Sequence, residues 1–225
     1  MLNPQLYAKL PYDASQFVPV AVMAGIPSVM LVHTSVQART VQEFIELARA
    51  NPGRLNYASQ GTTSVSFLTT EWFMSLAGGL KMTQVPYKGT GPGLAALLAG
   101  EVELMFDNLG TSLQQVRSGR LRALAVCGEK RVAALPDVPA MAEIYPGFIS
   151  IAWFGMVAPP RTSPQVAQKL ASAIAETLKM HDVQERLGRL SAEPIGLGPA
   201  EMREFMKRDA DRWREAIRIA GLKPQ

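Results

Sequence analysis

The sequence is poor in the residues on which disulfide and metal chemistry depend. It has one cysteine, Cys127, and two histidines, His33 and His181, which lie far apart in its 225 residues. A single cysteine excludes an internal disulfide and a cysteine-cluster metal site. Because Cys127 ends the apolar run 121–126, we expect a small buried thiol rather than a nucleophile. We therefore expect no metal and no cofactor.

Long apolar runs are also missing. The most apolar segment, residues 18–32, is interrupted by two prolines, a glycine and a serine. It is shorter than the roughly 20 apolar residues that a membrane span needs. Residues 1–13 lack the basic stretch and apolar core of a secretory signal peptide. As given, the chain is expected to be soluble and not membrane-embedded.

Charge excludes a further class of function. The net charge is only +4, from 23 basic and 19 acidic residues, and the basic residues are scattered. No arginine-rich face with interleaved aromatics occurs, so we expect no nucleic-acid partner. Apolar content of 48% against 19% charged residues describes a globular chain that forms one large or two small domains.

Catalytic motifs are absent as well. No Gly-x-Ser-x-Gly elbow supports a hydrolase, and Ser64, His33 and Asp107 have no spacing that favours a triad. The segment 61–64 lacks the lysine of a phosphate-binding P-loop. We therefore expect a protein that is not an enzyme, and a hydrolase is the least favoured alternative.

Strands and helices alternate along the chain. From about residue 55 to 126, strands that are apolar on both faces alternate with short helices, which predicts a mostly parallel α/β sheet. Residues 18–32 are expected as two extended pieces joined at 25–27. A helix that begins at Ser163-Pro164 is expected to bury one apolar face. That face consists of Val166, Leu170, Ile174 and Leu178.

The segment 55–64 is the most informative local pattern. A short strand runs into small polar residues and then into a helix that starts near Ser64. The first amides of a helix lack an intrahelical acceptor and attract anions, so a carboxylate or phosphate would fit beside Gly61. The same pattern also describes an ordinary strand-to-helix turn with a serine cap.

Polar or glycine-rich loops follow three strands of the expected sheet. They are residues 59–64, 87–93 and 107–108. Ligands of α/β sheets bind beyond the carboxyl ends of the strands, so the three loops together favour a ligand site. For Asp107 the alternative is a loop carboxylate that caps backbone amides.

Several longer stretches resemble one known family. They include Asn56-Tyr57-Ala58-Ser59 with Gly61 and Ser64, Val85 to Gly89, Gly100 to Asp107, Leu121 to Val126, Leu135 to Pro139, Tyr145 to Phe148, Trp153 and Trp213. Together they are similar, in order and over nearly the whole chain, to the substrate-binding receptors of tripartite tricarboxylate transporters, the Bug or TctC-type family.

The resemblance implies an α/β fold with two domains, of the type II, Venus-flytrap kind found in periplasmic binding proteins. It implies a periplasmic receptor, without catalysis, that binds a small organic acid (a mono- or dicarboxylate) and delivers it to membrane transporter subunits. By position, the residues expected to contact the acid are Ser59, Gly61, Thr62, Thr63, Ser64, Tyr87, Lys88 and Gly89, with Asp107 at the rim. The alternative is a ligand-sensing or regulatory module of the same fold.

The resemblance also implies a domain division and a truncation. Residues 34–131 match a complete second domain, whereas 1–33 and 148–225 match only later parts of the first domain, and 132–147 connect the two. We therefore expect an N-terminally truncated first domain, with uncovered strand edges that favour association. Without a signal peptide, the chain as given would be cytoplasmic.

Overall fold

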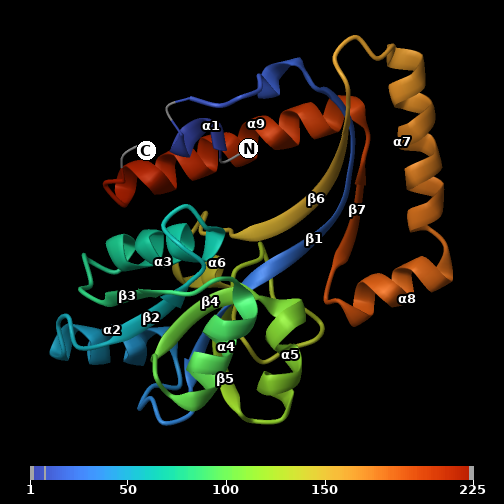
Figure 1. Cartoon of the computed structure of the whole chain (residues 1–225). Helices are drawn as coiled ribbons and strands as arrows, with labels where there is room; N and C mark the ends of the chain where they lie inside the picture. The colour runs from blue at the N-terminus through green and yellow to red at the C-terminus, as the bar shows by residue number, and fades with distance from the viewer. Residues whose placement is uncertain (1–2, 8, 223–225) are drawn as a thin grey trace. The chain divides into compact units, whose positions relative to one another are not determined.

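The computed structural model describes residues 3–7 and 9–222, and the chain divides into two compact units (Figure 1). Unit 1 consists of Met1–Ile26 and Trp153–Gln225, and unit 2 consists of Pro27–Ala152. The domain limits expected near residues 33, 131 and 148 stay a prediction about the domains of the whole receptor. None of the helices in the described ranges has the length and apolar character of a membrane-spanning segment.

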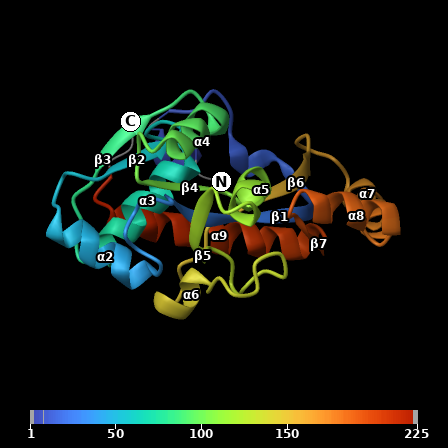
Figure 2. The same ribbon diagram turned by 90° about the horizontal axis from the view of Figure 1, so that it is seen from below.

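Unit 2 is a sheet with helices packed on it. Its strands, apart from the one that it shares with unit 1, are β2 (Asn56–Ser59), β3 (Thr83–Pro86), β4 (Leu104–Asn108) and β5 (Leu121–Val126). Its helices are α2 (Val41–Ala50), α3 (Val65–Leu76), α4 (Thr90–Ala99), α5 (Leu109–Arg117) and α6 (Met141–Ile144). Figure 2 shows α4 on one side of the strands and α2 on the other.

The shared strand is β1 (Val18–His33), a single continuous strand. The expectation of two extended pieces joined at 25–27 is therefore wrong. The β1–β7 ladder ends at Gly25, and the β1–β4 ladder begins at Ser28. Pro27 lies between these ladders, where its missing N–H removes no bond from either.

Strand direction in unit 2 is mixed. The order is β3-β2-β4-β1-β5, in which β2 pairs in parallel with β3 and β4, while β1 is antiparallel to β4 and β5. The expectation of a mostly parallel sheet missed only the reversed direction of β1, because apolar residues on both faces mark any strand covered on both sides, whatever its direction. Since β4 and β5 both oppose β1, the strands β2 to β5 nevertheless share one direction.

Aromatic side chains fill the core of unit 2. Phe73 lies 5.7 Å from Phe106 between ring centroids, and Trp72 stacks on Phe148 at 4.3 Å. All four side chains are buried, as is Cys127, whose thiol was expected to be buried. Burial raises the pKa of this thiol, so at neutral pH it is protonated and behaves as an apolar group.

Local sequence fixes where the helices of unit 2 begin. The Thr40 hydroxyl accepts the Glu43 N–H at 3.1 Å, and the Glu43 carboxylate in turn accepts the Arg39 N–H. The Ser64 hydroxyl likewise accepts the Phe67 N–H at the start of α3. The bonds donated by Glu43 and Phe67 satisfy first-turn amides that have no acceptor inside their own helix.

Unit 1 is built around the first half of β1. Its other elements are α1 (Asn3–Leu6), a 3₁₀ turn (Ala14–Gln16), β6 (Ile151–Ala158, which begins in unit 2), α7 (Pro164–Leu178), α8 (His181–Arg189), β7 (Glu193–Leu197) and α9 (Pro199–Ile219). Strands β6 and β7 both pair with β1. Trp153 packs edge-on against Phe205 of α9 and donates to the buried Asp209 at 3.0 Å.

Helix α7 begins at the expected cap, Ser163, but buries a different face from the one predicted. Its buried residues are Ala167 and Ala171, whereas Val166 is 50% and Leu170 is 40% exposed. The expected buried face is thus partly wrong. Ala167 and Ala171 pack with Val20 and Ala21 of β1, and Ile174 packs against this cluster, which leaves Val166 and Leu170 on the outside.

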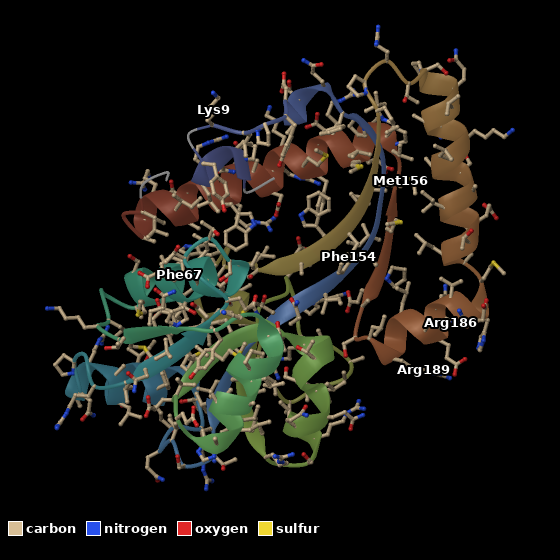
Figure 3. The ribbon with its side chains drawn as sticks, in the orientation of Figure 1. Lys9, Phe67, Phe154, Met156, Arg186 and Arg189 are labelled. Atoms are coloured by element: carbon tan, nitrogen blue, oxygen red, sulfur yellow. The ribbon has the colours of Figure 1, made fainter. Side chains whose placement is uncertain are left out.

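Strand β6 also exposes apolar side chains (Figure 3). Phe154 is 51% and Met156 is 38% exposed, and both are labelled in that view. Phe154 lines an apolar groove of about 460 Å³ within unit 1. The other lining residues are Met23, Ala24, Ile26, Ile174, Thr177, Leu178, Val183, Leu187, Leu190 and Ala192.

The different burial of two leucines gives a direct test of this packing. Leu97 of α4 is fully buried, so we expect Leu97→Ala to lower the free energy of unfolding by about 2–5 kcal/mol. Leu170→Ala removes a partly exposed side chain and should cost less than about 1 kcal/mol. Urea unfolding followed by circular dichroism measures both. A cost for Leu170→Ala as large as that for Leu97→Ala would contradict the exposure of α7.

Candidate functional site

The sheet of unit 2 brings three chain segments to one edge. Because β2 pairs in parallel with both β3 and β4, the carboxyl ends of all three strands point the same way. Ser59 is in register with Pro86 at the ends of β2 and β3. The loops after β2 and β3 and the start of α5 after β4 therefore lie along this edge, as the sequence predicted.

The loop after β2 is held by its own serines. The Ser64 hydroxyl lies 2.7 Å from the carbonyl oxygen of Gly61, to which it donates, and accepts the N–H of Phe67 (labelled in Figure 3). The Ser66 hydroxyl is buried; it accepts the Gln60 N–H at 3.1 Å and lies 3.0 Å from Ser64 Oγ. Gly61 has φ +101°, which favours glycine.

Some N–H groups at the beginning of α3 remain available to a ligand. The Phe67 N–H is taken by Ser64, whereas the N–H groups of Val65 and Ser66 have no acceptor within the described ranges. Such amides, together with the positive end of the helix dipole, bind anions.

The loop after β3 ends in a second helix start. Gly89, with φ +109°, precedes α4 and offers no side-chain cap. Among the residues that the structure describes, the N–H groups of Thr90 and Gly91 have no acceptor. Pro92 has no N–H group, so the first turn of α4 presents two amides rather than three.

Asp107 lies beneath these loops. It is only 3% exposed, and its carboxylate accepts the hydroxyl protons of Thr111, at 2.5 Å, and Thr90, at 3.4 Å. Burial raises the pKa of this carboxyl, while the bonds from Thr111, Asn108 and Thr90 oppose the rise. Asp107 is thus a buried support between α4 and α5, and its expected place at the rim of a ligand site stays a prediction.

The other predicted site residues divide into buried and accessible groups. Ser59 is 1% exposed, and its hydroxyl accepts the Gln84 amide at 2.7 Å, so it supports the loop from below. The remaining predicted residues are half-buried or exposed along the same edge: Gly61, Thr62, Thr63, Ser64, Tyr87, Lys88 and Gly89. Of these, Tyr87 donates its N–H to the Ser59 carbonyl at 2.8 Å, which joins the first two loops.

Two residues that join the loops were missed from sequence. The Gln60 side-chain amide donates to the Thr90 hydroxyl at 2.7 Å. Both residues lie inside the segments identified from sequence, but one is a glutamine and the other a helix-start threonine, and neither type marks a site by itself. Ser66 was missed for a similar reason, since a serine inside the apolar start of a helix has no distinctive pattern.

The arrangement does not provide a hydrolytic triad. The Ser64 hydroxyl is engaged by Gly61, Ser66 and Phe67, while His33 Nδ1 lies 2.7 Å from the Ser35 hydroxyl. Among the described residues, no group of three or more His, Cys, Asp and Glu side chains could hold a metal ion. The edge instead presents backbone amides and hydroxyls, which are groups able to bind and orient an anion.

Two units joined by a long shared strand, with a polar edge of strand-end loops, define the class of Venus-flytrap solute-binding proteins. Comparison with known proteins gives the family. The chain matches the tripartite tricarboxylate transporter family receptor, TctC, over residues 1–222, and it belongs to this family. These are receptors rather than enzymes.

Individual relatives agree with this membership. The chain is 33% identical over 220 residues to protein BugT of Bordetella pertussis, covering 97% of this chain and 67% of BugT. It is similar to the structure of R. palustris Rpa4515 with adipate, at 33% identity and a TM-score of 0.88, covering 100% of this chain and 75% of that one. MatC from Rhodopseudomonas palustris with bound malate is 30% identical with a TM-score of 0.80, covering 95% and 74% of the two chains.

The relatives are longer than this chain. The chain spans between 61% and 67% of the length of three curated relatives that it matches. The matches to the solved relatives Rpa4515 and MatC cover almost all of this chain but only about three quarters of each relative.

The buried Asp107 predicts a pH dependence of stability. Its folded pKa is raised above the ordinary value of 3.8, so the folded state holds the proton more tightly than the unfolded state. The contribution of Asp107 to stability should therefore fall as the pH rises from 3.8 through the raised pKa.

Unfolding by urea at a series of pH values, for wild type and Asp107→Asn, isolates this effect. We expect the difference in free energy of unfolding, wild type minus variant, to decrease as the pH rises. A difference that stays constant or increases would mean that burial does not control this carboxyl.

Proposed function

We propose that this chain is part of a periplasmic solute-binding receptor that captures a small organic acid for a tripartite tricarboxylate-type transporter. The acid is a mono- or dicarboxylate, and one of its carboxylates lies at the strand-end edge of unit 2. The residues proposed to contact it are Gly61, Thr62, Thr63, Ser64, Tyr87, Lys88 and Gly89, with Ser59 and Asp107 supporting them from below.

One observation carries the proposal: two helices begin side by side at the same edge with amides available. The N–H groups of Val65 and Ser66 and those of Thr90 and Gly91 lack acceptors within the described part of the chain. A carboxylate has two oxygens and about four acceptor positions, so it can accept from both pairs. Each hydrogen bond to a charged group contributes about 1.5–3 kcal/mol.

Charge and chemistry agree with an acid as the ligand. The net charge of +4 gives a weak field that attracts anions. Lys88 is exposed at the same edge, where it can add a cation without a fixed geometry. Rpa4515 is described with adipate and MatC with malate, and both of these molecules are dicarboxylates.

The periplasmic location and the transporter partner follow from the family role. A receptor of this family meets its acid outside the inner membrane and then contacts transporter subunits, so we propose the same for the protein that contains this chain. Binding would require no covalent step and no cofactor, because amides and hydroxyls suffice to hold a carboxylate.

Isothermal titration calorimetry with adipate, malate and the uncharged diamide of adipic acid tests the ligand class. We expect the dicarboxylates to bind and the diamide to bind at least tenfold more weakly, since it lacks the charge that the amides recognise. Tighter binding of the diamide than of adipate would rule out carboxylate recognition.

A pair of serine variants tests the position of the site. Ser64→Ala removes the cap that orders the start of α3, so we expect the affinity for the preferred acid to fall about tenfold. Ser118→Ala is the matched control, because Ser118 caps the far end of α5, and it should leave affinity unchanged. Equal affinities of wild type and Ser64→Ala would place the ligand elsewhere.

A further inference from the structure

Gln60 is bonded to the starts of two different helices. Its backbone N–H donates to Ser66 Oγ in the first turn of α3 at 3.1 Å, and its side-chain amide donates to Thr90 Oγ1, the first residue of α4, at 2.7 Å. One residue of the loop thus connects the two helix starts whose amides are available.

The Thr90 hydroxyl is oriented for this contact. A hydroxyl has one proton to donate and two lone pairs with which to accept. Thr90 directs its proton towards Asp107 Oδ1 at 3.4 Å, which leaves its lone pairs for the Gln60 amide. Asp107 is itself fixed by burial and by the Thr111 hydroxyl, so Gln60 is tied through Thr90 to the end of β4.

The surrounding bonds make Gln60 a rigid connection rather than a loose one. The Gln60 N–H donates to Ser66 Oγ. Ser66 is only 5% exposed, and its Oγ also lies 3.0 Å from Ser64 Oγ. Displacing Gln60 would therefore disturb both the Ser64 cap and the Thr90 hydroxyl. In a partly buried site such linked bonds are coupled in energy.

We propose that the Gln60–Thr90 hydrogen bond is a positioning contact of the anion site, which fixes the separation between the amides at the start of α3 and those at the start of α4. Gln60 and Thr90 act here through the backbone amides, by holding both donor pairs in place before the acid arrives. Preorganised donors bind more tightly because less ordering remains to be done on binding. This inference rests on the proposed carboxylate site.

A double-mutant cycle tests the contact. Gln60→Met and Thr90→Val keep side-chain size and remove the bond, and each should weaken adipate binding roughly 3- to 10-fold. Because both remove the same bond, the double variant should bind no more than about twofold worse than either single variant. Thr90→Ser keeps the hydroxyl and should retain wild-type affinity, while Gln60→Asn is one methylene too short and should behave as Gln60→Met.

Hydrogen exchange of the ligand-free protein gives a readout that does not depend on the acid. We expect Gln60→Met to speed amide exchange in both 60–66 and 89–92, and Thr90→Val to do the same. The matched controls are Gln42→Met, on the exposed face of α2, and Thr83→Val, at the opposite end of β3, and neither should change these segments.

The two readouts separate failure of the proposed function from failure of this inference. If wild type binds no carboxylate while exchange responds in both segments, the positioning contact stands and the proposed ligand is wrong. Additive losses in the double variant, or faster exchange only in the segment that carries the substitution, would overturn the positioning role.

Discussion

The parallel pairing of β2 with β3 and β4 is the constraint on which the site depends. It places the ends of three strands at one edge, so each helix that follows begins there and directs its first amides to the same region. The bond from the Tyr87 N–H to the Ser59 carbonyl extends this pairing one residue beyond the strands. A shift of one residue in the register between β2 and its neighbours would turn Ser59 to the opposite face of the sheet and separate the loops.

Buried polar side chains hold this edge in shape. Ser59, Ser66 and Asp107 are each no more than 5% exposed, and each bonds to a loop or helix start above it. Such groups are costly to bury unless their bonds are satisfied, so they favour one arrangement of the loops over others. Ser59 was expected to contact the acid and Asp107 to lie at the rim of the site, and both stay predictions; in the structure their side chains support the loops.

Local chemistry is what could be predicted from the sequence. The caps at Ser64 and Ser163, the burial of Cys127 and the three strand-end loops all follow from short-range rules. The reversed direction of β1 could not be predicted, because apolar residues on both faces of a strand carry no directional information. The contact between Gln60 and Thr90 spans 30 residues and depends on sheet register, which the sequence pattern does not give.

The apolar face of α7 shows a second limit of prediction from sequence. Val166 and Leu170 have the helical spacing of a buried face and are nevertheless exposed, since Ala167 and Ala171 make the close contact with the sheet. Periodicity identifies an apolar face but does not say which part of it is covered. Phe154 and Met156 of β6 are further exposed apolar residues of unit 1.

A buried carboxyl, Asp107, lies beneath the proposed anion site, and its charge matters for binding there. An ionised Asp107 would repel a bound carboxylate, and burial already favours its neutral form. Thr111, Asn108 and Thr90 donate to Asp107, so either form of the carboxyl is held in place, while the Thr90 hydroxyl also accepts from the Gln60 amide. The same hydroxyl therefore satisfies the acid below and accepts from the loop above. The helix starts that carry the available amides are therefore held in place whichever protonation state Asp107 adopts.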